Sequence, residues 1–304
     1  MVFAALALYG DVQQLRQTAR TFAPSALALA LLLAGGNYAV RIVRWQYYLL
    51  HLGMRVPIGE SSIVFLCGFV MSVTPGKVGE VFKSLLLQET RGIPFARTAP
   101  IVVAERLTDL IALVLLISIG SFAFEHGAAV AALSAALVAF LVLVCAYRPL
   151  GRSLLRLADR IPLIARFSSK LHDAYDSLLV MTRPVPLLVG STVAFLAWSM
   201  ECGSLYAIVH GFPGVQMGWV ASVFAYSTST IAGAIAMMPG GLGVTEVGMT
   251  ALLQALGGPS MLPAVAIATT ILVRIATLWF AVAIGLVALL IQRATRRGVR
   301  PTAI

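Results

Sequence analysis

The chain has 304 residues, of which 60% are hydrophobic and only 11% are charged, and its mean hydropathy is +0.93. Soluble domains are roughly one quarter charged, so this composition excludes an ordinary water-soluble enzyme domain. The net charge of +10 comes from basic residues at the ends of apolar blocks and in one loop, as in membrane proteins. No basic stripe is interleaved with aromatic residues, so no nucleic-acid partner is expected.

The first apolar blocks predict membrane helices, because crossing a bilayer takes about 20 residues. Residues 1–24 are expected to be an interfacial segment, with an amphipathic helix at 10–22. A long block follows at residues 25–50, then shorter runs at 61–73 and 81–87 on either side of a break at 74–80. Further long blocks at 97–124 and 128–147 complete residues 25–147, which we interpret as a first repeat plus one extra helix.

The second half begins with a basic segment, residues 148–184, whose apolar residues recur at helical spacing and predict amphipathic surface helices. Residues 185–291 form a second repeat, with apolar blocks at 185–209, 217–238, 244–256 and 261–291 and a break at 239–243. Residues 292–304 are a basic tail. The cysteines and histidines are scattered, so neither a metal nor a cofactor is expected.

The two breaks resemble each other. Each contains Pro-Gly, follows an apolar block with Ser or Thr, and precedes an apolar run that ends in Leu-Leu-Gln. With residues 148–184 in the cytoplasm, the positive-inside rule places the N-terminus outside and the C-terminus inside. The predicted fold is therefore an all-α polytopic membrane protein with inverted repeats, each holding a Pro/Gly-broken pair of re-entrant or half-helices. Such breaks mark transporter-type binding sites, because freed backbone groups persist only around a cavity or inside protein.

Ionisable side chains within apolar blocks are expensive, at about 2.5–3.5 kcal/mol each on insertion scales, and commonly functional. An alternative is that they only lock the repeats together, for instance by pairing Asp109 with Arg274. Arg44 could draw a lipid phosphate towards a cavity, or Arg44 and Trp45 could anchor the chain at the membrane surface. The candidate substrate-binding residues are Asn37, Arg41, Arg44, Thr74, Pro75, Lys77, Glu80, Lys83, Glu105, Arg106, Asp109, Glu201, Pro239, Gly240, Glu246 and Arg274.

These motifs together resemble the flippase-like membrane domain of the lysylphosphatidylglycerol synthase family, over roughly residues 25–290. The matching segments are residues 37–45, Pro75-Gly76-x-x-Gly79-Glu80, Glu105-Arg106-x-x-Asp109, and Pro239-Gly240-Gly241-x-Gly243 with Glu246. The resemblance implies a stand-alone bacterial member in the cytoplasmic (inner) membrane. The aminoacyl-transferase domain of the full synthases has no counterpart in this sequence, so lysyl transfer is not expected.

The resemblance and the charged breaks together predict a flippase or scramblase rather than an enzyme. Its partners would be membrane lipids: an anionic or aminoacylated phospholipid, or a polyprenyl-linked lipid. We expect two cavities open to opposite sides, with cations that receive the head group. Two alternatives remain: a membrane-embedded transferase, in which Glu80, Glu105 and Asp109 supply a base or metal ligands, and a non-catalytic partner of a lipid-modifying enzyme.

Overall fold

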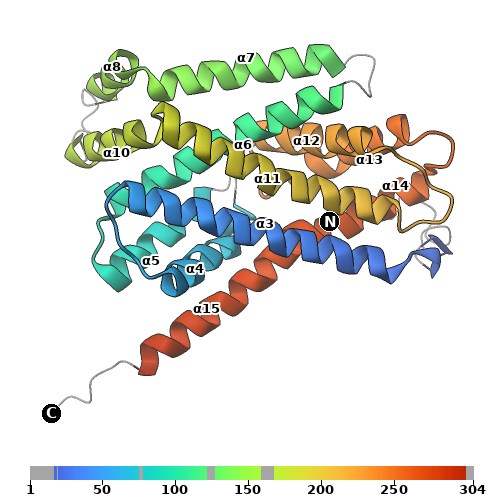
Figure 1. Ribbon diagram of the computed structural model, residues 1–304, viewed down its shortest axis with the longest axis horizontal. Coiled ribbons are helices and arrows are strands. Elements are labelled where there is room, and N and C mark those ends of the chain that lie inside the picture. Colours follow the sequence, from blue (N-terminus) through green and yellow to red (C-terminus); the bar gives the residue numbers. More distant parts are fainter. Residues whose placement is uncertain (1–16, 19, 75–77, 122–126, 159–167, 299–304) are drawn as a thin grey trace.

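A computed structural model describes residues 17–18, 20–74, 78–121, 127–158 and 168–298 (Figure 1). All elements within these ranges are helices, as the composition predicts. The first half contains α3 (Pro24–His51), α4 (Ile58–Cys67), the 3₁₀ turns η1 (Gly68–Met71) and η2 (Val78–Val81), α5 (Phe82–Arg91), α6 (Phe95–Gly120) and α7 (Gly127–Ala146). The second half contains α8 (Arg148–Ala158), α10 (Ser168–Met181), α11 (Pro184–Val209), α12 (Trp219–Ile235), α13 (Val244–Leu256), α14 (Pro263–Arg274), the π-helical segment η4 (Ile275–Trp279) and α15 (Phe280–Gly298).

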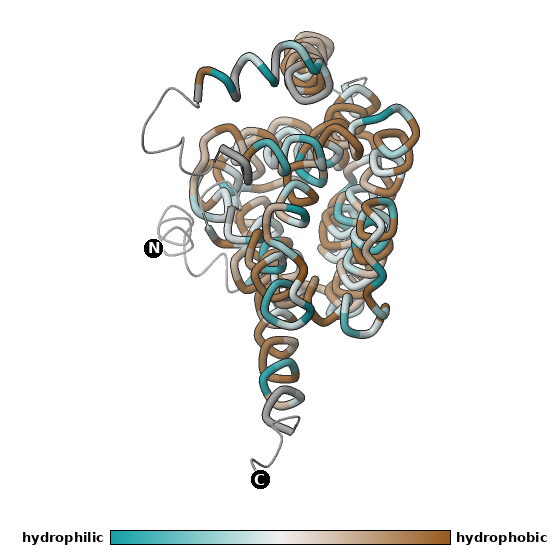
Figure 2. The backbone as a smooth tube through the Cα atoms, turned by 90° about the vertical axis from the view of Figure 1, so that its left-hand side faces the viewer, coloured by the Kyte–Doolittle hydropathy of each residue, from teal (hydrophilic) through white to brown (hydrophobic). Residues whose placement is uncertain are grey.

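Long apolar helices form the body of the molecule. Within the described residues, Pro24–His51, Pro184–Val209 and Pro263–Thr295 are long and apolar enough to cross a membrane. Each begins with proline, whose fixed φ suits the first helical turn and whose missing N–H has no partner to lose there. Hydrophobic residues run along most of the helical tube (Figure 2). Large ones also face outward, such as Leu32 and Leu133, which are 72% and 76% exposed, as a lipid solvent requires.

Helices α3 and α11 pack side by side through the middle of the molecule (Figure 1). Gly36 allows this approach, because a Cβ at that position would lie 3.2 Å from the Met200 sulfur. The Asn37 Nδ2 donates a 2.7 Å hydrogen bond to the Ala197 carbonyl oxygen of α11. Gly36 is thus the position of close approach, whereas a Cβ on the neighbouring Gly35 would meet nothing within 4 Å.

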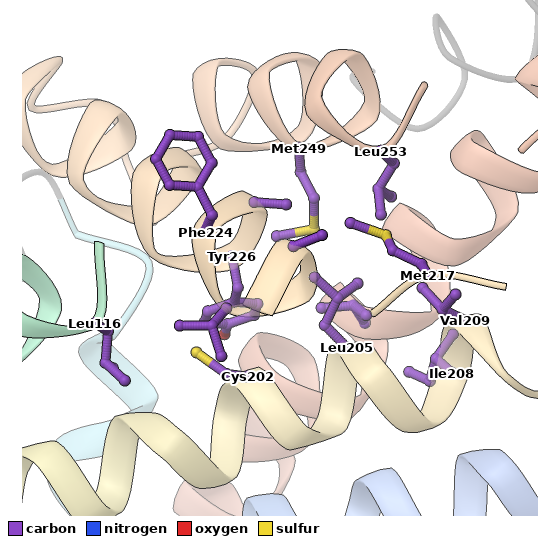
Figure 3. Packing of buried hydrophobic residues seen from close by; sticks show 14 of the residues in the cluster. Leu116, Cys202, Leu205, Ile208, Val209, Met217, Phe224, Tyr226, Met249 and Leu253 are labelled. Carbon is purple, nitrogen blue, oxygen red and sulfur yellow. The ribbon is translucent and has the colours of Figure 1, made fainter. Parts of the chain in front are cut away.

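Two buried clusters hold the helices together. One joins α11 to α6, α12, α13 and α14, and Figure 3 shows Leu205, Met249 and Leu253 facing one another within it. The other joins α3 to α4, α5 and α15 around Trp45 and Tyr48. Each cluster contains one pair of helices separated by a break, which we call an interrupted pair: α12–α13 in the first cluster and α4–α5 in the second. The two pairs lie at opposite ends of the bundle in Figure 1.

The final apolar block differs from the single helix that its composition predicts. The helix continues from α14 into α15, but five residues between them, Ile275–Trp279, adopt a π-helix. The Tyr38 hydroxyl of α3 donates a 2.8 Å hydrogen bond to the Thr277 carbonyl oxygen in this segment. A π-helix shifts the backbone hydrogen-bond register, and such segments are common at functional sites. This one directly follows the buried Arg274.

The basic segment forms helices α8 and α10, as expected from its periodicity. The amphipathic helix predicted at residues 10–22 lies largely outside the described residues, and so do Pro75, Gly76 and Lys77 of the first break. The other candidate residues are all described.

Candidate functional site

A cavity of about 250 Å³ lies in the middle of the bundle, where the breaks of the two interrupted pairs approach each other. The first pair contributes Phe69 and Ser72, and the second contributes residues 237, 238, 240 and 241. Helices α12 and α13 of the second pair also line the cavity, and α3, α6, α11, α14, η4 and α15 form the remaining walls. The two breaks therefore line one shared cavity, whereas the sequence suggested a cavity for each. Its charged lining residues are Arg41, Arg106, Asp109, Glu201 and Arg274.

A threonine side chain joins the two sides of the first break by hydrogen bonds. The Thr74 hydroxyl donates a 2.7 Å hydrogen bond to the Met71 carbonyl oxygen and accepts a 2.8 Å bond from the Gly79 backbone N–H. The hydroxyl thus bridges the end of η1 and the start of the next element. Gly79 is required here, because a Cβ would lie 2.6 Å from the Met71 side chain.

In the second break, glycines with left-handed backbone conformations make the turn, in place of a side-chain hydrogen bond. Gly240, Gly241 and Gly243 have φ values of 61°, 70° and 94°, in the left-handed region that other residues rarely adopt. A Cβ on Gly240 would also lie 3.1 Å from the Val73 side chain, so the two breaks contact each other here. The Glu246 carboxylate accepts a hydrogen bond from the Gly243 N–H and caps the start of α13.

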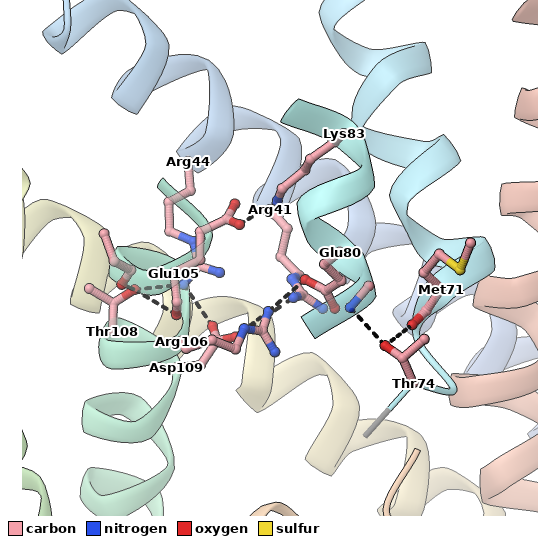
Figure 4. A network of polar contacts seen from close by, with 12 residues as sticks. Arg41, Arg44, Met71, Thr74, Glu80, Lys83, Glu105, Arg106, Thr108 and Asp109 are labelled. Atoms are coloured by element: carbon pink, nitrogen blue, oxygen red, sulfur yellow. Dashed lines mark hydrogen bonds and ion pairs between the residues drawn. The ribbon is translucent and has the colours of Figure 1, made fainter. Parts of the chain in front are cut away.

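Seven charged residues form the first-half charge cluster, shown in Figure 4: Arg41, Arg44, Glu80, Lys83, Glu105, Arg106 and Asp109.

Asp109 lies at the centre of this cluster. Its Oδ1 lies 2.7 Å from Arg44 Nη1, and its Oδ2 lies 3.0 Å from Arg106 Nη2 and 3.6 Å from Arg41 Nη2. The Arg106 Nη2 also lies 3.0 Å from Glu80 Oε2, so Arg106 bridges the first break and α6. The Arg106 side chain is 25% exposed, which makes it the most accessible cation of the cluster.

Lys83 and Glu105 form a second pair deeper in the protein. Lys83 Nζ donates to Glu105 Oε2 and lies 4.4 Å and 4.7 Å from the ring centroids of Trp45 and Phe65. Aromatic faces stabilise a buried ammonium through their quadrupoles. Neither charged residue lines the cavity. The pair instead joins α5 to α6 outside the cavity and so stabilises the position of α6, which carries Arg106 and Asp109.

Among the described residues, the second half buries fewer charged side chains than the first: Glu201, Glu246 and Arg274. Arg274 Nε lies 2.6 Å from Glu246 Oε1, and its Nη2 donates a 2.6 Å hydrogen bond to the Gly240 carbonyl oxygen. The arginine therefore ties α14 to both sides of the second break. Glu201 of α11 lies apart from this pair and accepts a hydrogen bond from the Tyr226 hydroxyl of α12.

Two interpretations of the charged residues are wrong. Asp109 and Arg274 do not pair across the halves, because each has its partners in its own half. Arg44 and Trp45 are not a surface anchor, since they are 1% and 0% exposed. Arg44 does not reach the cavity either. Instead it donates hydrogen bonds to Thr108 and Asp109.

The remaining candidates divide by position. Arg41, Arg106, Asp109, Glu201, Gly240 and Arg274 line the cavity. The others support its walls: Asn37 between helices, Thr74 and Pro239 in the breaks, and Glu80, Lys83, Glu105 and Glu246 in ion pairs. Sequence reasoning missed Tyr38, Trp198 and Tyr226, which also line the cavity. The polar run at residues 226–230 inside an apolar block was a usable signal for Tyr226.

Helices able to cross a bilayer several times, packed around buried ion pairs, define a multi-pass α-helical membrane protein. The sequence matches the family described as the lysylphosphatidylglycerol synthase TM region over residues 1–285, and the chain belongs to that family. A UPF0104 membrane protein of Methanothermobacter thermautotrophicus is 25% identical over 277 residues, which cover 85% of this chain and 81% of the relative. A second match to a UPF0104 membrane protein of that organism is 29% identical over 125 residues, covering 41% of this chain and 36% of the relative. The family resemblance drawn from the motifs is confirmed.

Proposed function

We propose that this protein moves lipids between the two leaflets of a membrane, as a flippase or scramblase. The observation that carries the proposal is the shared cavity, which both breaks line and which presents Arg106 and Arg41 beside mainly apolar walls. An arginine fork binds phosphate oxygens with two parallel hydrogen bonds. The head group would enter the cavity while the acyl chains remain in the bilayer.

The proposed membrane arrangement is an inverted repeat with two re-entrant pairs. Its support is the position of α4–α5 and α12–α13 at opposite ends of the bundle (Figure 1). Arg91, Arg97 and the basic helix α8 would face the cytoplasm, with the N-terminus outside and the C-terminus inside the bacterial inner membrane. Each pair would then lead to the same cavity from a different side of the membrane.

The proposed cargo is a lipid with an anionic group in its head: an anionic or aminoacylated phospholipid, or a polyprenyl-linked lipid. The family description names lysylphosphatidylglycerol synthase, which agrees with a phospholipid-related role. Transport rather than catalysis is supported by the carboxylates of the first half. Glu80, Glu105 and Asp109 each form an ion pair with an arginine or lysine, which leaves them poorly placed as a base or metal ligands.

The test uses purified protein in liposomes that carry a trace of phosphatidylglycerol with a fluorescent head-group label. An impermeant quencher added outside reports the protected inner-leaflet pool. We expect that pool to disappear with the wild-type protein and the rate to fall about tenfold or more in Arg106→Gln. This follows because a hydrogen bond to a charged group is worth about 1.5–3 kcal/mol.

Arg152→Gln is the matched control, because Arg152 is an exposed arginine of α8 away from the cavity. It should leave the rate unchanged. A protected pool that persists with folded wild-type protein, for phosphatidylglycerol and for lysylphosphatidylglycerol, would overturn the proposal. Product formed from a labelled lipid phosphate by the protein alone would favour a transferase instead.

A further inference from the structure

The charges of the core balance only when the two halves are taken together and Arg106, whose side chain is 25% exposed, is counted with the buried residues. The first-half charge cluster holds four cations, Arg41, Arg44, Lys83 and Arg106, against three carboxylates, Glu80, Glu105 and Asp109. In the core of the second half, Arg274 and Glu246 form an ion pair, and one further carboxylate, Glu201, is buried. Among the described core residues, Glu201 is therefore the counter-charge to the excess cation across the cavity.

Glu201 differs from every other carboxylate of this core. It is 7% exposed, lines the cavity and forms no ion pair with a described residue. Its hydrogen-bond donor is the Tyr226 hydroxyl, which is a neutral group. A carboxylate offers about four acceptor positions, so this contact leaves it poorly compensated. Burying a charged group that has no ion-pair partner is costly.

The groups that face Glu201 come from each neighbouring helix around the cavity. Tyr38 and Arg41 of α3 interact with it electrostatically, and so do Tyr226 of α12 and its own neighbour Cys202. Arg106 and Asp109 of α6 and Arg274 of α14 complete the charged lining. Asp109 and Arg274 are held by partners of their own, and the arginines stay charged at any physiological pH. Among the described lining residues, Glu201 is thus the charged group that no ion pair holds.

An anionic head group that binds Arg41 and Arg106 would replace Glu201 as the counter-charge. The cavity would then contain one negative charge too many, and uncompensated charge in a low-dielectric site is costly. Protonation of Glu201 removes the excess without breaking any ion pair of the first-half charge cluster.

We propose that Glu201 is a proton-binding site that couples anionic lipid movement to a proton gradient, as an electroneutral one-to-one symport. A proton from water on the acidic side adds to a Glu201 carboxylate oxygen as the head group enters. The same O–H bond breaks when the head group leaves, and the proton returns to water on the other side. This inference rests on the proposed lipid transport, and it adds the driving force.

The test imposes a pH gradient of one unit across the proteoliposomes, with potassium and valinomycin holding the membrane potential near zero. Labelled phosphatidylglycerol should accumulate in the leaflet facing the alkaline side. At equilibrium the ratio approaches about tenfold, because one pH unit corresponds to a factor of ten. Glu201→Gln should lose the accumulation, which is measured at equilibrium, and Glu60→Gln, at a partly exposed carboxylate outside the cavity, should keep it.

A second measurement needs only the wild-type protein. A pH indicator trapped inside the liposomes should record about one proton for each anionic lipid that moves down an imposed lipid gradient. Phosphatidylethanolamine labelled on an acyl chain, which keeps its zwitterionic head group, should move no protons.

The outcomes separate the two proposals. If lipid equilibrates between leaflets regardless of the pH gradient, or if Glu201→Gln keeps the accumulation, coupling at Glu201 is overturned while lipid transport stands. If Glu201→Gln slows phosphatidylethanolamine alone, Glu201 binds an ammonium and the proton site is likewise overturned. Protein-free liposomes give the background redistribution caused by the gradient itself. If no labelled lipid moves under any condition, both proposals are overturned.

Discussion

The two helix breaks share a Pro-Gly motif and one cavity, yet they are held by different forces. Around the first break lie the seven residues of the first-half charge cluster, and the Thr74 hydroxyl joins the two sides of the break by hydrogen bonds. Around the second, one ion pair suffices and left-handed glycines close the backbone. The first half thus supplies a cation-rich wall held by ion pairs. The second half supplies a tight backbone turn. It also supplies Glu201, a carboxylate that forms no ion pair with a described residue. Similar sequence motifs therefore do not imply similar roles within one protein.

The largest expected difference concerns the loss of a central carboxylate. Asp109→Ala leaves Arg41 and Arg44 buried without their shared counter-charge, which should cost about 3–5 kcal/mol in unfolding free energy. Glu246→Ala should cost less, because Arg274 keeps its hydrogen bond to Gly240 and lies beside the cavity. Equilibrium unfolding in mixed detergent and dodecyl sulfate measures both. Equal losses of unfolding free energy in the two variants would show that the two halves do not differ in how strongly a central carboxylate stabilises them.

Backbone conformation gives the next largest effect. Gly240→Ala forces a left-handed φ on a residue with a Cβ, at about 1–2 kcal/mol, and presses that Cβ towards Val73. We expect lower stability and slower lipid movement, because this contact joins the two breaks. Gly35→Ala is the matched control, since a Cβ there meets nothing within 4 Å and the residue is helical. If both variants behave alike in the unfolding assay, glycine geometry does not define the second break.

Much of the fold could be predicted from the sequence, because lipid as a solvent imposes simple patterns. Apolar block lengths gave α11 within one residue and α13 with its observed bounds. The π-helix at Ile275–Trp279 could not be predicted, because it leaves composition and periodicity unchanged over so few residues. Its stabilising contact, from Tyr38, comes from a helix more than two hundred residues earlier.

The site was predicted in part for a similar reason. Charged residues in apolar blocks point to a buried site, so Arg106, Asp109, Glu201 and Arg274 were identifiable. Their partners were not, because pairing depends on which helix faces meet in the folded protein. The expected Asp109–Arg274 pair illustrates this limit, since packing of α3 against α6 brings Arg44 to Asp109 instead.

A smaller effect should distinguish how the first break is closed. Thr74→Val keeps the side-chain shape but removes the hydrogen bonds to Met71 and Gly79. The expected loss is about 1 kcal/mol in the same unfolding assay. Thr295→Val is the matched control, because its hydroxyl donates to the Ile291 carbonyl of its own helix. A loss at Thr295 as large as at Thr74 would show that bridging the break adds nothing.

The smallest effect is expected where the first pair ends at the surface. Arg91 of α5 donates hydrogen bonds to Glu60 of α4, and these bonds hold the pKa of Glu60 below its usual value. A lowered pKa in the folded state means that the pair stabilises the protein at neutral pH. The contribution is lost as pH falls through that lowered pKa. Exposed ion pairs are nevertheless weak and screened by salt, so Glu60→Gln should scarcely change the melting temperature at pH 7. Wild type and variant should become indistinguishable once the pH lies well below that lowered pKa. A large loss at pH 7 would mean that surface charge, and not the buried cluster alone, holds α4 and α5 together.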